Sequence, residues 1–233
     1  MKSNKLTLPA DVTASGFYIT NIRNNIIGNA ASGGWAGFAF PVLKRPIGHY
    51  ANVVTRPAAR IALTIDGNTA HSTGWWWSHA GAFYFGGALY KDESDNNKLK
   101  YNAGRELSSR GSRNPCKVDM CLQNANWCDL DCQVEDHAWN IITNNKAFLT
   151  AGIGLQSWKG RMELSKFEAH DVGLAVEALA SGFWIHNMLV VCRTGEKFEM
   201  PDGSHPNRIS GNGFKWYDTC KFEPALILHV QFQ

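Results

Sequence analysis

The feature that most constrains the fold is an outline of residues that recurs three times along the chain. The stretches IIGNAASGGWAGFAF, IDGNTAHSTGWWWSHAGAFYF and SKFEAHDVGLAV occupy residues 26–40, 65–85 and 165–176. Each runs from an apolar strand through a polar corner with a small residue to a glycine and another apolar strand. The second copy is longer than the first by six residues between Asn68 and Phe83. A solenoid tolerates such insertions at a corner because each repeat contacts only its neighbours.

The rest of the chain also favours strands over helices. Short runs rich in Val, Ile, Phe, Tyr and Thr alternate with Gly, Asn, Asp or Ser, which is typical of β-structure. The best helix candidate, residues 170–183, contains two glycines, and glycine disfavours a helix. We therefore predict an all-β chain of one domain over residues 1–233, folded as a right-handed parallel β-helix with neighbouring strands about 4.8 Å apart.

Two segments break the repeat, and we expect both to project from the solenoid as loops. Residues 41–60 contain three prolines and little strand pattern. Residues 91–137 begin with the charged KDESDNNK and end in a Cys-rich stretch. This second segment is a Cys-rich insertion between coils.

The cysteines indicate an oxidising compartment. Cys116, Cys121, Cys128 and Cys132 lie close together in one polar stretch, where disulfides are favoured over zinc because the repeated two-residue gaps of common zinc modules are missing. Their pairing stays open, and so does whether Cys192 and Cys220 are buried thiols or a further disulfide. The first twenty residues lack the apolar run of a signal peptide. We therefore expect a piece of a longer extracellular or cell-surface protein whose signal peptide lies upstream.

Charge and motifs exclude several classes of function. The net charge of +3 is scattered without a basic block, so nucleic acid is not an expected partner. The sequence has no apolar run of about 18 residues that would span a membrane. Phosphate loops, dinucleotide fingerprints and Gly-x-Ser-x-Gly elbows are missing in a strand-then-helix setting, so no cofactor is expected. Nor do His49, His79 and His137 add a metal-like spacing.

Three adjacent tryptophans, Trp75, Trp76 and Trp77, are the first candidates for ligand binding. Alternate side chains of an extended segment face opposite ways, so all three cannot enter one core. An exposed indole offers a flat apolar face to the CH groups of a sugar. The alternative is that they pack beneath the 91–137 insertion or against a neighbouring domain.

Histidines and carboxylates at the corners are weaker candidates for catalysis. His71 and His170 occupy matching places in NTAHS and FEAHD, and Asp171 follows the second, which suggests a general acid/base pair. Surface or backbone-bonded imidazoles are the alternative, although His71 also lies near the tryptophans and is a candidate for ligand binding. Asn29 and Asn68 are expected at equivalent turns, in the left-handed conformation or bonded to neighbouring backbone. Carboxylates expected near coil corners are those of Asp66, Glu168, Asp171 and Glu177.

The residues resemble a known family, the parallel β-helix region of the cell-migration-inducing, hyaluronan-binding hyaluronidases and of fibrocystin-like proteins. NNIIGNAASGGWAGFAFPVLKRPIG looks like the family's Asn-rich corner, Ala pair, Gly-Phe and Pro-containing loop. IDGNTAHST is similar to its Asn-x-Ala-His-Ser corner, and GNGFKWYDTCKFEPALILHVQF to its Phe-x-Trp-Tyr-Asp and following strand. The matches are spread over residues 16–232.

This resemblance implies two alternative functions. One is a non-catalytic segment that binds a polysaccharide, a protein partner or neighbouring domains of its own protein. The other is part of a hyaluronidase-like enzyme that cleaves polysaccharide. Family members carry upstream a domain with eight glycines that is linked to hyaluronan chemistry, and nothing in these 233 residues resembles it. We therefore favour the binding segment over the enzyme, since a fold alone does not confer chemistry.

Overall fold

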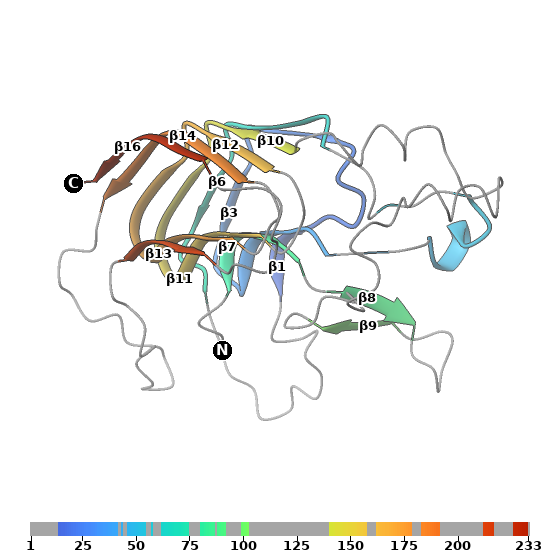
Figure 1. Ribbon diagram of the computed structural model, residues 1–233. Helices are drawn as coiled ribbons and strands as arrows, with labels where there is room; N and C mark the ends of the chain where they lie inside the picture. The colour runs from blue at the N-terminus through green and yellow to red at the C-terminus, as the bar shows by residue number, and fades with distance from the viewer. Residues whose placement is uncertain are drawn as a thin grey trace, which may run out of the picture.

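Successive strands stack in parallel into the coils of a solenoid, as the computed structural model in Figure 1 shows. Fourteen strands form one continuous sheet that curls around the core. The predicted all-β, parallel β-helix is therefore confirmed. The structure describes residues 14–41, 43, 46–54, 57, 62–74, 80–86, 88–91, 99–102, 140–157, 162–178, 183–191, 212–216 and 226–232.

Each complete coil contributes to three faces of this sheet, which succeed one another around the solenoid and are called the first, second and third sheets. The first sheet contains β2 (Asn25–Ile27), β5 (Thr64–Asp66), β10 (Asn140–Thr143), β12 (Met162–Ser165), and the first halves of β14 (Phe183–Val191) and β16 (Leu226–Phe232). The second contains β3 (Ala30–Ser32), β6 (Thr69–His71), the first parts of β11 (Lys146–Ser157) and β13 (Glu168–Ala178), and the ends of β14 and β16. The third contains β1 (Ser15–Tyr18), β4 (Ala36–Ala39), β7 (Gly81–Phe85), the later parts of β11 and β13, and β15 (Asn212–Trp216).

The register confirms the alignment of the three sequence repeats. Phe38 pairs with Phe83 and Ala31 with Ala70, so the additional residues of the second copy fall between the second and third sheets. The structure adds two coils that the repeat search did not include, at residues 140–157 and 183–191. The helix candidate at 170–183 is strand β13 over most of its length.

The first corner, between the first and second sheets, is made the same way in five coils. One residue takes a positive φ and the next points into the solenoid. Because the left-handed conformation is costly for most L-residues, the first two coils use glycine there. The positive-φ residues are Gly28, Gly67, Asn144, Lys166 and Asn187. Asn29 and Asn68 are therefore not the left-handed residues of their turns, although they do bond the neighbouring backbone as predicted.

Asparagines behind this corner form a ladder along the inside of the solenoid. Asn68 is fully buried, and its Nδ2 donates to Asn145 Oδ1 at 2.9 Å and to Ile26 O at 2.8 Å. Its Oδ1 accepts from the backbone N of Asn29 at 3.0 Å and from Asn29 Nδ2 at 3.1 Å. One amide thus satisfies polar groups of the coils on both sides. Phe167 and Met188 take the ladder position in the two later coils, where the contact is apolar.

Small and aromatic residues fill the core in two further ladders. Ala31, Ala70, Ala147 and Ala169 stack one above the other behind the second sheet. On the third sheet, the rings of Phe17, Phe38 and Phe83 stack with centroid distances of 4.7 and 4.9 Å. Phe40 and Phe85 repeat this stacking at 4.3 Å. Aligned identical side chains are what a parallel ladder without register shift produces.

In the described part of the chain, a short helix and a two-stranded hairpin lie outside the coils. The 3-10 helix η1 (Gly48–Tyr50), within the predicted 41–60 loop, is exposed and lies to the right of the solenoid in Figure 1. Strands β8 (Ala88–Lys91) and β9 (Leu99–Asn102) pair as an antiparallel hairpin, so the start of the 91–137 insertion is a hairpin rather than a simple loop. Cys116, Cys121, Cys128, Cys132, Cys192 and Cys220 lie outside the described residues.

Replacing Asn68 by Ala should cost about 2–4 kcal/mol of unfolding free energy. The substitution removes the side-chain partner of Ile26 O and of Asn29 N, and each polar group left unsatisfied costs about 1–3 kcal/mol. Asn29→Ala is the matched control, because Asn29 ends the ladder and is less buried, so its loss should be about 1 kcal/mol. Urea unfolding measures both variants, and equal losses would contradict a central role for Asn68.

Candidate functional site

The three sheets differ in whether their outer faces reach solvent. On the third sheet the outward residues Trp35 and Tyr84 are buried and contact each other edge to face. Glu177 lies in the same layer, fully buried, and accepts a 2.6 Å hydrogen bond from Gln156 Nε2. This carboxylate was expected near a corner, but it lies within β13 on the covered face. The side chains that can reach a ligand in solvent therefore lie on the outer faces of the first and second sheets.

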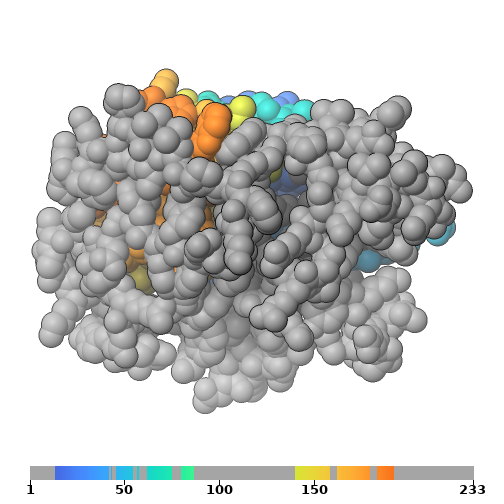
Figure 2. All heavy atoms as spheres, in the orientation of Figure 1, coloured from blue at the N-terminus to red at the C-terminus, as the bar shows by residue number. Residues whose placement is uncertain are grey.

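The outer face of the first sheet presents two columns of side chains, one residue per coil in each. Atoms of the coils that carry β5, β10 and β14 lie along the top of Figure 2, in cyan, yellow and orange. Ile141 and Trp184 are 50% and 42% exposed, and Glu163 lies between them in the same column. The second column contains Ile27, Asp66, Thr143, Ser165 and His186.

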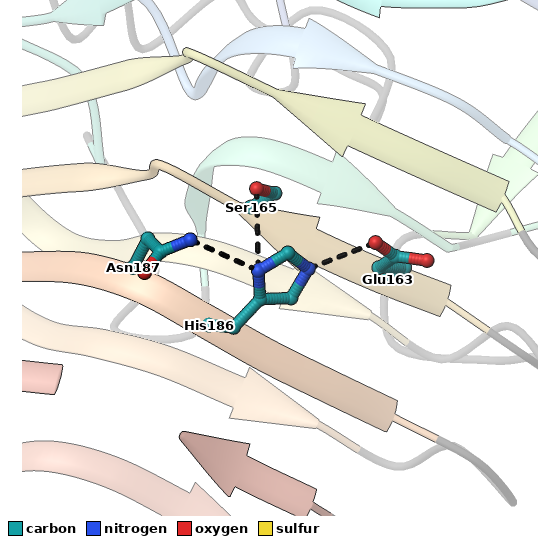
Figure 3. Close-up of polar contacts among 4 residues, drawn as sticks. All are labelled: Glu163, Ser165, His186 and Asn187. Carbon is teal, nitrogen blue, oxygen red and sulfur yellow. Dashed lines mark hydrogen bonds and ion pairs between the residues drawn. The ribbon is translucent and has the colours of Figure 1, made fainter. Parts of the chain in front are cut away.

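Glu163, Ser165, His186 and Asn187 form the densest polar cluster on this face (Figure 3). His186 Nε2 lies 2.8 Å from Glu163 Oε1, across neighbouring coils. On the other side of the ring, His186 Nδ1 lies 3.3 Å from Asn187 Nδ2 and 3.5 Å from Ser165 Oγ. His186 is therefore held between Glu163 on one side of its ring and Asn187 and Ser165 on the other.

Asp66 lies in the same column as Ser165 and His186, two coils before Ser165. Its Oδ1 accepts hydrogen bonds from Thr143 Oγ1 and from Asn144 Nδ2, the latter at 2.7 Å. The bonds from Thr143 and Asn144 lower the pKa of Asp66; burial opposes them and the charge of Lys166 adds to them. Asp66 is therefore ionised at neutral pH.

The outer face of the second sheet carries the two histidines predicted from the repeats. His71, Phe148 and His170 are aligned on successive coils, which confirms the matching places of the two histidines. The His71 ring stacks on Phe148 with centroids 4.6 Å apart, so Phe148 separates the two imidazoles. His170 Nε2 lies 3.3 Å from Glu168 Oε2, and Lys146 Nζ lies 3.0 Å from the same oxygen. Burial works to raise the pKa of Glu168, but its contacts with Lys146 and His170 lower it overall.

Comparison with known proteins agrees with this architecture. Residues 2–76 match the family model described as the CEMIP beta-helix. This match lies within the first third of the chain. The resemblance drawn from the repeats is thus confirmed.

Similar proteins of Dictyostelium discoideum are much longer than this chain. Over its whole length the chain is 36% identical to protein rliB, of which it covers 18%. It is 37% identical to a G8 domain-containing protein, of which it covers 14%. Over 93% of its length it is 37% identical to communication mutant protein F, of which it covers 18%. The chain thus spans about a sixth of these proteins. No solved structure matches it.

The structure places only some of the residues singled out in the sequence. His71, His170 and Asp171 lie on the second sheet or its far corner, and Asp171 is a positive-φ corner residue. The carboxylate that contacts His170 is that of Glu168. Trp75, Trp76 and Trp77 lie outside the described residues, so their role in binding stays a prediction.

The cluster around His186 was missed in the sequence. Its signal was present in FWIHNM, where His-Asn occupies the same places as Asp-Gly in IDGNTA and Thr-Asn in IITNNKA. Within the described part of the chain, no group of three His, Cys, Asp or Glu residues is arranged to hold a metal ion. In the same residues, no helix is long and apolar enough to cross a membrane.

Thr143→Val should raise the pKa of Asp66 toward its ordinary value of about 3.9. A carboxyl whose pKa is lowered by folding stabilises the protein above its unfolded pKa, and this stabilisation is lost as the pH falls through the folded pKa. The variant should therefore lose less stability than the original chain below about pH 4. NMR titration of the Asp66 carboxyl and urea unfolding at stepped pH measure the two effects. Thr64→Val, on the strand of Asp66, is the control. An unchanged Asp66 titration in Thr143→Val would contradict the role of the Thr143 hydrogen bond in lowering the pKa of Asp66.

Proposed function

We propose that this chain is a polysaccharide-binding β-helix segment of a longer extracellular or cell-surface protein, and that the polymer binds across the outer face of the first sheet. The observation that carries the proposal is the column Ile141, Glu163 and Trp184, in which an exposed indole and an exposed aliphatic side chain flank a carboxylate. Sugars present apolar CH faces and hydroxyl edges, and this column offers a partner for each.

The rigidity of the face supports binding. The backbones of neighbouring strands are hydrogen-bonded in parallel, so Glu163, Trp184 and His186 stand in fixed register before a ligand arrives. Pre-organised groups lower the ordering cost of association. The Trp75 to Trp77 stretch and His71 belong to the proposal as a second contact region, on the grounds of their sequence alone.

Cleavage of the polysaccharide is the second candidate function, and one observation favours it. Glu163 and His186 form an ordered pair 2.8 Å apart, as a general base and its orienting group do in enzymes. Binding without cleavage is the simpler proposal, because Nδ1 of His186 is already engaged by Asn187 and Ser165.

Trp184→Ala should weaken binding to a recognised polysaccharide about three- to tenfold, since the loss of one aromatic contact is worth about 0.5–1.5 kcal/mol. Tyr50→Ala is the matched control, because Tyr50 is an exposed aromatic on η1, away from the face. Affinity electrophoresis against a glycan panel that includes hyaluronan measures both, and polymer length is read after the same incubation. Equal weakening by the two variants would speak against this face. Shortened polymer that disappears in His186→Ala would favour the enzyme.

The proposed extracellular location predicts that Cys116, Cys121, Cys128 and Cys132 are oxidised in the secreted protein. Disulfides form and persist in oxidising compartments, and they restrict the unfolded ensemble of a segment that has little core. Intact mass after alkylation, with and without prior reduction, counts the free thiols. Four thiols alkylated without reductant would rule out this part of the proposal.

A further inference from the structure

We infer that the polymer bound by the first sheet is an uncharged polysaccharide that runs along the solenoid axis, across the strands. This inference rests on the proposed function and specifies its ligand. It separates this chain from an anionic polymer such as hyaluronan, which the family resemblance alone would suggest.

The charge of the face is the first ground. Among the described residues, the outward strand positions of the first sheet carry three ionisable side chains, those of Asp66, Glu163 and His186. His186 is paired with Glu163 at 2.8 Å. Lys166 at the corner and Arg23 before β2 are the flanking cations. A uronic acid placed against the outward strand positions would therefore face the like charges of Asp66 and Glu163.

The free oxygens of the two carboxylates are the second ground. His186 holds Oε1 of Glu163, and Thr143 with Asn144 holds Oδ1 of Asp66. Within the described structure, Glu163 Oε2 and Asp66 Oδ2 accept no hydrogen bond. A carboxylate oxygen only accepts, and the hydroxyls of a neutral sugar donate. Each acid is therefore oriented on one side and available to a sugar hydroxyl on the other.

The spacing of the coils is the third ground. Neighbouring coils are roughly 4.8 Å apart, close to the length of one pyranose residue in an extended chain. Asp66, Thr143, Ser165 and His186 follow one another in one column on β5, β10, β12 and β14, and Glu163 and Trp184 occupy the column beside it. A polymer along the axis meets one coil per sugar, so its contacts repeat without bending. Affinity should then rise with oligosaccharide length until the chain covers these four coils.

The test compares the full chain with Glu163→Gln and Asp66→Asn, which keep the shape of each side chain and remove its charge. The probes are soluble uncharged polymers and their oligomers (laminarin, xylan and cello-oligosaccharides) and two anionic polymers (hyaluronan and polygalacturonate). Calorimetry at low and moderate salt gives the affinities. Glu168→Gln is the matched control, a similarly exposed acid on the second sheet. Circular dichroism and thermal unfolding show that each variant is folded.

We expect at least one uncharged polymer to bind with little dependence on salt, and each carboxylate substitution to weaken it about tenfold. Glu168→Gln should leave this affinity unchanged. Binding of only the anionic polymers, strengthened by Glu163→Gln, would overturn the inference and leave the proposed function standing. Failure of every polymer to bind the folded chain would overturn the proposed function itself.

Discussion

The buried amide of Asn68 is the interaction on which the first three coils depend. It bonds to Asn29 on one side and Asn145 on the other, so the first corner is held in register by directional contacts. A register shift by one residue would turn every outward side chain of the sheet into the core. The columns on which Asp66, Thr143, Ser165 and His186 lie therefore follow from contacts made inside the solenoid.

Much of the architecture could be predicted from the sequence because the first two coils carry clear sequence signals for their corners. Gly28 and Gly67 provide the left-handed corner, and an Asn follows each of them. The coils at 140–157 and 183–191 were missed because Asn144 and Asn187 replace the glycine. In the last of these coils Met188 also replaces the ladder asparagine. Packing of Met188 in the core supports the corner there, so the local sequence signal for the turn is weaker.

The site was less accessible to sequence reasoning than the fold. Matching places put His71 and His170 in one column, but they did not show that Phe148 lies between them. Glu163 and His186 are 23 residues apart, and their contact depends on which residues face outward on two neighbouring strands. The alternation of side chains along β14 likewise decides whether Trp184 faces outward. Such contacts appear only when the register of adjacent coils is known.

The five first corners differ in sequence but never in length. From the strand of the first sheet to that of the second, each coil turns on a single positive-φ residue and one inward residue. Between the described strands, additional chain lies at the other two corners, as between β6 and β7 and in the segments that precede β5 and β10. The outer surface of the first two sheets is therefore continuous across this corner, with no insertion between their described strands. Adding a coil would lengthen this continuous surface, whereas changing a loop at another corner would alter only the edges of the surface.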